Sequence, residues 1–200
     1  ANGAFVPFIE LTSELHNNSF YSLTRENPYY SAAGESQPAN VEYKLRGGFS
    51  GSVSSVFTYN VYVGGGLIKD GAYQVYNMTI VDEYLMPRFF MFRDKRLSYF
   101  MMGAELGVST GGFSVLASGH YYNYSSKDLE HAIWRPSFDA SVQFKYNYNS
   151  KLFLRAGAEF IGPRYFAVVY GYSNQPIEYA KYKADFNVTP GVDYFVNPKF

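Results

Sequence analysis

The stretch SFDASVQFKYNYNSKLFLRAGAEF, residues 137–160, alternates apolar and polar side chains with a period of two. Every even position from 138 to 148 is apolar or aromatic, and the even positions from 152 to 160 are apolar again. The odd positions of the first half are Asp139, Ser141, Gln143, Lys145 and Asn147. This period predicts two β-strands with one apolar and one polar face, joined near Asn149–Ser150. Whether the apolar face meets a protein core or a lipid bilayer decides the fold.

The composition narrows the class of protein. A chain of 200 residues is long enough for one domain with a sizeable core, so we expect a single domain over 1–200. Aromatic residues make up 20% of the chain, with 21 Tyr and 18 Phe, and Tyr suits a boundary between oil and water. The formal net charge is zero, which argues against nucleic acid as a partner, because such a partner needs a clustered basic excess. The absence of cysteine excludes disulfides and thiolate chemistry, and the apolar runs are too short to predict a transmembrane helix.

The same alternation predicts eight strands along the chain. They cover residues 4–13, 41–50, 56–67, 97–109, 113–123, 137–147, 151–161 and 182–195. Their connections alternate strictly between short and long. The short connections are 51–55, 111–112, 148–150 and 196–199, and the long ones are 13–40, 68–96, 123–136 and 161–181. Short turns on one rim and long loops on the other are typical of an outer-membrane barrel.

Two hairpins allow a test of the register. A two-residue turn at Gly111–Gly112 pairs Thr110 with Phe113, so the apolar face should change from even to odd positions, and it does. A three-residue connection over 148–150 pairs Asn147 with Lys151, so the apolar face should stay on even positions, and it does. Both hairpins therefore keep one apolar face on one side of one sheet.

The make-up of the apolar face favours lipid. It mixes Ala and Gly with aromatic residues, whereas a soluble sandwich or barrel would bury bulky Leu, Ile and Val there. Aromatic residues gather near strand ends, for example Tyr43, Phe49, Tyr146 and Tyr194, as in the girdles of membrane barrels. We therefore expect an all-β fold, an antiparallel transmembrane β-barrel in the cell outer membrane of a Gram-negative bacterium, with short periplasmic turns and long extracellular loops. A soluble antiparallel barrel is the alternative.

Two segments, 17–30 and 121–166, carry a resemblance to a known family. The motifs are Asn27-Pro28-Tyr29, Trp134-Arg135-Pro136-Ser137-Phe138-Asp139-Ala140 and Gly162-Pro163-Arg164-Tyr165. They resemble the later barrel hairpins of TonB-dependent-receptor-like outer-membrane proteins. The resemblance implies a long region before Ala1 and further strands after Phe200. The plug domain and energy-coupling box that are typical of such receptors do not occur in these residues, so the resemblance does not extend to active transport.

The size of the barrel follows from the strand count. Eight strands can close into a barrel whose interior is just filled by side chains. However, Asn197-Pro198 predicts a turn where a closing strand would be needed, so we expect a piece of a larger barrel.

The polar face holds the candidate functional residues. The polar side chains that we expect to face the lumen are Glu42, Lys44, Arg46, Glu105, His120, Asp139, Lys145, Arg155, Glu159, Lys183, Asp185 and Asp193. They could line a channel or a solute site. Because both signs are interspersed and no ring of one sign occurs, they could equally form a ladder of cross-strand ion pairs that fills the lumen.

Catalysis and metal binding have little support in the sequence. A hydrolase would need a trio such as Ser118, His120 and Glu105, yet no strained turn marks a nucleophile. His16 and His131 have no second ligand at metal spacing. We expect no catalytic residue, no metal and no cofactor.

Three functions remain open for such a barrel. The first is passage or binding of a solute or glycan. The second is a structural role, as a scaffold subunit of an outer-membrane complex. The third is lipid modification by an outer-membrane enzyme. The expected partners are outer-membrane lipid and, for the scaffold, proteins of that complex.

Overall fold

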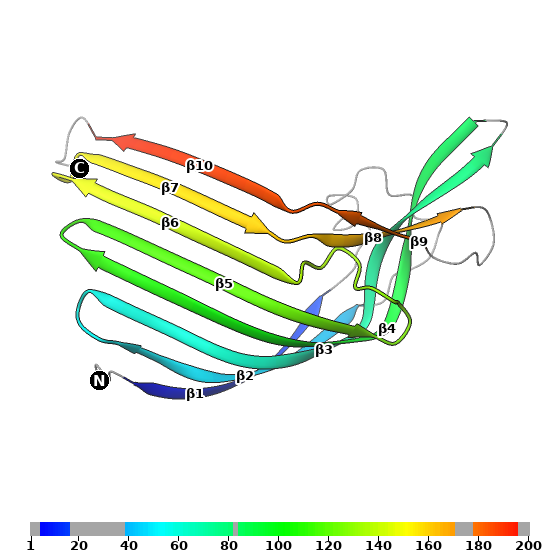
Figure 1. The fold of residues 1–200 in the computed structure, drawn as a ribbon, viewed down its shortest axis with the longest axis horizontal. Helices are drawn as coiled ribbons and strands as arrows, with labels where there is room; N and C mark the ends of the chain where they lie inside the picture. Colours follow the sequence, from blue (N-terminus) through cyan, green and yellow to red (C-terminus); the bar gives the residue numbers. More distant parts are fainter. Residues whose placement is uncertain (1–4, 17–38, 82–83, 171–177, 196–200) are drawn as a thin grey trace.

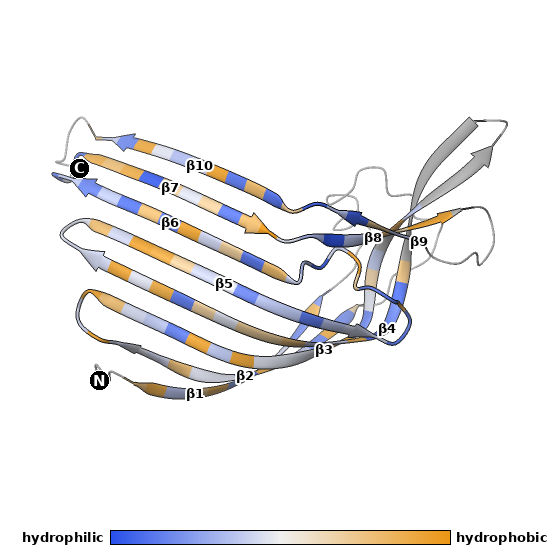
Figure 2. Cartoon of the chain, in the orientation of Figure 1, coloured by the Kyte–Doolittle hydropathy of each residue, from blue (hydrophilic) through white to orange (hydrophobic). Residues whose placement is uncertain are grey.

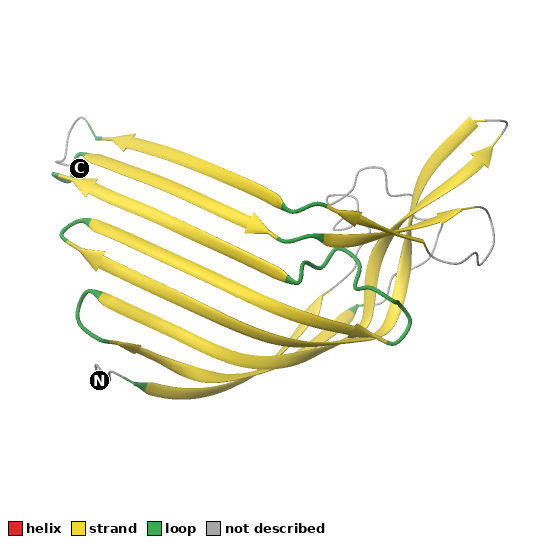
Figure 3. Ribbon diagram, viewed as in Figure 1, coloured by secondary structure: helices red, strands yellow, loops and turns green. Residues whose placement is uncertain are grey.

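The structure of the chain, a computed structural model, describes residues 5–16, 39–81, 84–170 and 178–195. These residues form strands, turns and loops (Figure 3). The strands are β1 (Val6–His16), β2 (Asn40–Ser52), β3 (Phe57–Val81), β4 (Tyr84–Thr110), β5 (Phe113–Ser126), β6 (Phe138–Tyr148), β7 (Leu152–Ile161), β8 (Arg164–Tyr170), β9 (Glu178–Tyr182) and β10 (Asp185–Tyr194). Within the described ranges, no helix is long and apolar enough to cross a membrane.

Eight of the strands form one curved antiparallel sheet (Figure 1). Their order is β1-β2-β3-β4-β5-β6-β7-β10, and each pairs with its neighbours through a continuous register. The sheet is open, with β1 at one edge and β10 at the other. Pro7 lies in the edge strand β1, where the missing N–H is tolerated. The predicted antiparallel strands are confirmed, and they form part of a barrel.

Of the two turns used to test the register, the first has the predicted pairing and the second does not. Gly111 and Gly112 both have positive φ, and Thr110 pairs with Phe113 as expected. At the other turn Asn149 and Ser150 have positive φ, and Tyr148 pairs with Leu152. The predicted pairing of Asn147 with Lys151 is therefore wrong by two residues in register. The apolar face stays on even positions because a shift of two leaves the parity unchanged.

The prediction of a loop over residues 68–96, the longest of the predicted loops, is wrong. β3 and β4 continue through it as one hairpin, with an unchanged register from Phe57↔Val108 to Val81↔Tyr84. Within this register only Asp70 and Lys95 are unpaired. Asp70 has a positive φ of 58°, and the two strands turn away from the rest of the sheet in this region (Figure 1).

The predicted loop 161–181 also contains strands. β8 pairs in parallel with β3, from Tyr76↔Val168 onwards, and antiparallel with β9. The predicted strand 182–195 is divided, because Tyr182 ends β9 and Asp185 begins β10. Lys183 lies in the short connection between them, so its predicted place within a membrane strand is wrong. Residues 17–38 of the predicted loop 13–40, which include Asn27-Pro28-Tyr29, lie outside the described residues, and so does the predicted turn at Asn197-Pro198.

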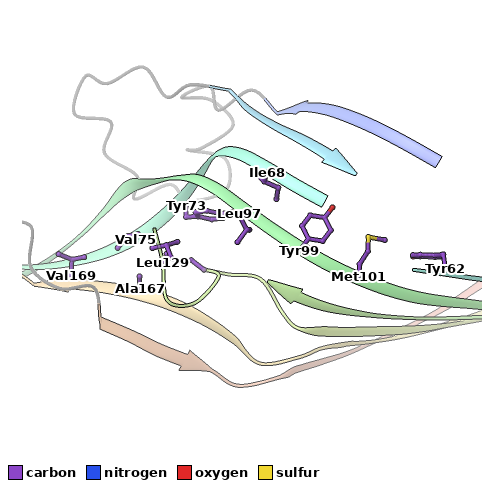
Figure 4. Packing of buried hydrophobic residues seen from close by; sticks show 11 residues of the cluster. Tyr62, Ile68, Tyr73, Val75, Leu97, Tyr99, Met101, Leu129, Ala167 and Val169 are labelled. Carbon is purple, nitrogen blue, oxygen red and sulfur yellow. The ribbon is translucent and has the colours of Figure 1, made fainter. Parts of the chain in front are cut away.

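The ends of β3 and β4 beyond Asp70, together with β8, β9 and segment 127–136, form what we call the distal unit. Ile133 forms an isolated bridge with Tyr165 and so places segment 127–136 beside β8. The most deeply buried apolar side chains of the described residues cluster here and at the bend (Figure 4). Val75, Ile133 and Ala167 are 0–1% exposed. The core of the molecule thus lies at the long-loop end of the strands.

Candidate functional site

The two faces of the eight-stranded sheet differ sharply in chemistry. Along each strand, apolar and polar residues alternate (Figure 2). Large apolar side chains of one face are exposed, for example Val142 by 46%, Val192 by 66% and Phe186 by 70%. Exposure of so much apolar surface to water is unfavourable, whereas contact of the same surface with lipid is favourable. The opposite face, which we call the polar face, holds the predicted charged residues.

Registered pairs align polar side chains in rows across the polar face. One row contains Asn60, Glu105, Ser118, Ser141, Glu159 and Asn187, one residue from each of six neighbouring strands. The hydroxyls of Ser118 and Ser141 are 2.8 Å apart, and Asn60 donates to Glu105 at 3.5 Å. Residues that are distant in sequence therefore share one polar row, in which two neighbouring pairs are hydrogen-bonded.

Several predicted charges form cross-strand pairs. Arg46 Nη2 lies 2.6 Å from Glu10 Oε2, and Arg155 Nη2 lies 2.7 Å from Asp193 Oδ2. Asp185 accepts a hydrogen bond from Arg164. Glu42 accepts one from the hydroxyl of Tyr99. These contacts favour the interpretation of the polar face as a partly neutralised ladder.

Of the predicted residues that lie within the strands of the eight-stranded sheet, Lys44, Lys145 and Glu159 have no ion pair or side-chain hydrogen bond with the described part of the chain. Lys44 is half-buried, whereas Lys145 and Glu159 are exposed. They retain hydrogen-bonding capacity for something other than their strand neighbours.

His120 and its surroundings do not form a hydrolytic trio. Its Nδ1 lies 2.6 Å from Oδ1 of Asp139, its registered partner on β6, and Glu105 instead accepts from Asn60. The Ser118 hydroxyl is engaged with Ser141. No group of three or more potential metal ligands occurs among the residues that are placed. The described geometry thus offers a His–Asp pair without an adjacent free nucleophile.

The sequence reasoning missed the tyrosines of the polar face. Tyr99 is 5.9 Å from Tyr124 and 6.3 Å from Tyr122, ring centre to ring centre, and Tyr122 stacks on Tyr124 at 5.7 Å. A Cβ added at Gly103 would lie 2.6 Å from Cζ of Tyr62, so this glycine leaves space for the ring. Tyr62 and Gly103 are registered across the β3–β4 hairpin, and Gly66 and Tyr99 are too. A glycine opposite a tyrosine was the signal that could have predicted these rings.

A second group of residues that the sequence did not predict stabilises the bend, the place near Asp70 and Lys95 where β3 and β4 turn away from the rest of the sheet. Asp94 is fully buried and accepts hydrogen bonds from Arg96 N at 3.0 Å and from Ser126 Oγ at 2.7 Å. The same Ser126 Oγ accepts from the backbone N–H groups of Asp128 and Leu129, at 3.1 and 3.0 Å. The start of segment 127–136 is therefore fastened to β4 at the bend.

Arg135 lies between two tyrosines near the bend. Its guanidinium carbon is 5.8 Å from the ring centre of Tyr73 and 5.9 Å from that of Tyr124. Burial raises the pKa of Tyr73, and the positive charge of Arg135 opposes part of that rise. The Tyr73 hydroxyl is buried without a hydrogen-bond partner among the described residues.

Comparison with known proteins identifies the fold. No family model and no curated protein sequence matches the chain. Solved structures do: the pyoverdine outer membrane receptor FpvA from Pseudomonas aeruginosa PAO1 (TM-score 0.60, 13% identity) and the FrpB iron transporter from Neisseria meningitidis (TM-score 0.55, 12% identity). The copper transporter OprC gives a TM-score of 0.58 at 11% identity. Alignments cover 98%, 96% and 99% of this chain, but only 28%, 30% and 30% of those chains.

These matches are TonB-dependent outer-membrane receptors, so the predicted resemblance is confirmed at the level of the fold. The chain has the fold of part of an outer-membrane β-barrel. The exposed apolar face accords with that fold, which places the chain in the outer membrane. The matched proteins are receptors and transporters rather than enzymes.

Proposed function

We propose that this chain forms part of an outer-membrane barrel that binds a solute or glycan and lets it pass, with the polar face lining the interior. The observation that carries the proposal is the continuous polar face. Rows of hydroxyl, amide and charged groups cross six strands, opposite an apolar face that suits lipid. Charges at Lys44, Lys145 and Glu159 remain available on it.

The fold supports transport in general and leaves the solute open. The matched structures are described as a pyoverdine receptor, an iron transporter and a copper transporter. One fold therefore serves different cargoes. A shared fold does not transfer a ligand, because ligand choice depends on particular side chains. We propose a ferric siderophore, copper and an oligosaccharide as the first panel to test.

The experiment compares uptake in cells with and without the full-length protein. Radiolabelled ferric siderophore, copper and an oligosaccharide are supplied separately, and accumulation is measured. We expect one of them to accumulate only with the protein present, and Asp139→Ala, which removes the carboxylate that pairs with His120, to reduce that uptake. Thr110→Ser at an exposed turn serves as the matched control. Equal accumulation of all three with and without the protein, together with co-purification of a stable partner, would favour the scaffold function instead.

A further inference from the structure

The short-turn end of the polar face has an unusual row of donors. Registered pairs place Ser109 beside Ser114, Ser114 beside Lys145, and Lys145 beside Arg155. The row thus consists of two hydroxyls followed by two cations. Like charges that lie directly opposite each other in a sheet destabilise it, so this pair needs negative charge nearby.

The described residues supply only half of that negative charge. Asp193 binds Arg155, with Oδ2 at 2.7 Å from Nη2. Arg155 also lies beside Gly191, where an added Cβ would be in ordinary van der Waals contact, 3.6 Å from Nε. Lys145 has no carboxylate partner among the described residues. Two positive charges against one negative charge leave a local excess of one.

Lys145 also borders two hollows of the surface. The larger, of about 520 Å³, is lined by Lys145, Arg155 and Asp193, with Asn147, Ser109 and Ser114 as further polar groups. The smaller, of about 190 Å³, shares Lys145 and both serines and adds Thr58 and Gln143. The ammonium therefore stands where a small molecule can reach it, among hydroxyl and amide donors.

From this arrangement we propose that the short-turn end of the polar face binds a small anion, or the phosphate or carboxylate group of a solute. Lys145 provides the charge, Ser109 and Ser114 provide hydroxyl donors, and Arg155 shares its guanidinium between Asp193 and the anion. Hydrogen bonds between charged groups and oxyanions are the stronger ones in proteins, which suits this donor set. The site goes beyond the proposed function, because it requires no transport.

The test is binding of inorganic phosphate and of citrate to the purified full-length protein in lipid nanodiscs, measured by calorimetry at low salt. We expect saturable binding of at least one of them. Lys145→Gln should weaken it by at least about tenfold, and Lys145→Arg should restore most of it. Lys151→Gln, which removes an equal charge from the neighbouring turn, should leave the affinity within about twofold.

A second variant changes the affinity in the opposite direction. Asp193→Asn frees the Arg155 guanidinium and should tighten anion binding several-fold, a result that loss of folding does not produce. Phosphate binding without citrate binding would assign a phosphate site, and the reverse a carboxylate site. Absence of binding for both probes, or equal affinity in wild type and Lys145→Gln, would overturn the proposal. Because no uptake is measured, a failure of the transport function leaves this result standing.

Discussion

On the membrane-crossing parts of β3 and β4 the large side chains of the apolar face are exposed, with Val63 exposed by 55% and Met102 by 43%. Beyond the bend, in the distal unit, Val75 is fully buried although it lies on the same strand. The buried positions of β3 change from even, at Ile68, to odd, at Tyr73 and Val75, on passing Asp70. One hairpin therefore meets lipid with its apolar residues on one side of the bend and a packed protein core on the other.

The difference shows that period-two alternation determines which residues share a face, whereas the surrounding medium determines whether that face is covered by lipid or by other parts of the protein. In the bilayer the apolar face needs no protein partner. Outside it, the same kind of face must be covered by other parts of the chain, and β8, β9 and segment 127–136 do this. Substitutions on the two sides of the bend should thus fail in different ways.

The largest effect is expected from Ile133→Ala in the distal unit. Ile133 is fully buried, and loss of its side chain should leave a cavity that costs about 2–5 kcal/mol. The damage should be local, so insertion into lipid continues while amide hydrogen exchange of β8 accelerates. Val53→Ala, at a turn residue that is 70% exposed, is the control and should change exchange little. Unchanged exchange in Ile133→Ala would mean that the distal unit has no core of its own.

Val142→Arg tests the opposite side of the comparison. An arginine on a lipid-facing surface near mid-membrane should cost about 2–4 kcal/mol or block insertion. Gln143→Arg, on the neighbouring polar-face position, should fold with a much smaller change. Urea titration of the full-length protein in lipid vesicles measures both. Equal behaviour of the two variants would contradict the assignment of the faces.

Asp94→Ala tests the fastening at the bend. It removes the acceptor for Arg96 N and Ser126 Oγ in a fully buried position, which should cost about 1–3 kcal/mol. Arg93→Ala, which breaks the more exposed pair with Asp70, should cost less than about 1 kcal/mol. Protease susceptibility of the distal unit gives the measurement. Adding Ser126→Ala to Asp94→Ala should cost less than the two single changes together, because both belong to one network.

Tyr73→Phe should give the smallest effect at neutral pH, below about 1 kcal/mol, because the hydroxyl has no partner in the described part of the chain. Burial raises the folded-state pKa of Tyr73, so the unfolded state loses its proton first as the pH rises. Wild-type stability should therefore fall above about pH 10, the unfolded value, and fall less in Tyr73→Phe. Tyr194→Phe, an exposed site, is the control for denaturant titrations at pH 7 and 11. An identical alkaline loss in Tyr73→Phe would show that another group causes it.

The sequence predicted the membrane-crossing strands well because lipid imposes a strict alternation over about ten residues per strand. The prediction from sequence failed beyond Asp70. There the buried side chains of β3 change from even to odd positions at a residue with positive φ, and the alternation of apolar and polar residues does not predict this change. The strands β8 and β9 were missed because their faces are set by contacts with β3 and segment 127–136, which are distant in sequence. Among the polar-face residues, paired charges such as Arg155 and Asp193 could be predicted by sign. The Asp94–Ser126 network and the tyrosines over glycines depend on the register between strands, and alternation alone does not reveal them.

The central claim is that even positions of β6 face lipid and odd positions face the interior. The chain has no cysteine, so single cysteines can be introduced at consecutive positions from Ala140 to Lys145 and carry a nitroxide label. In lipid vesicles, we predict that collisions with oxygen dominate at the even positions and collisions with a water-soluble nickel complex at the odd ones. An accessibility that is uniform along β6, or that alternates with the opposite phase, would contradict the claim.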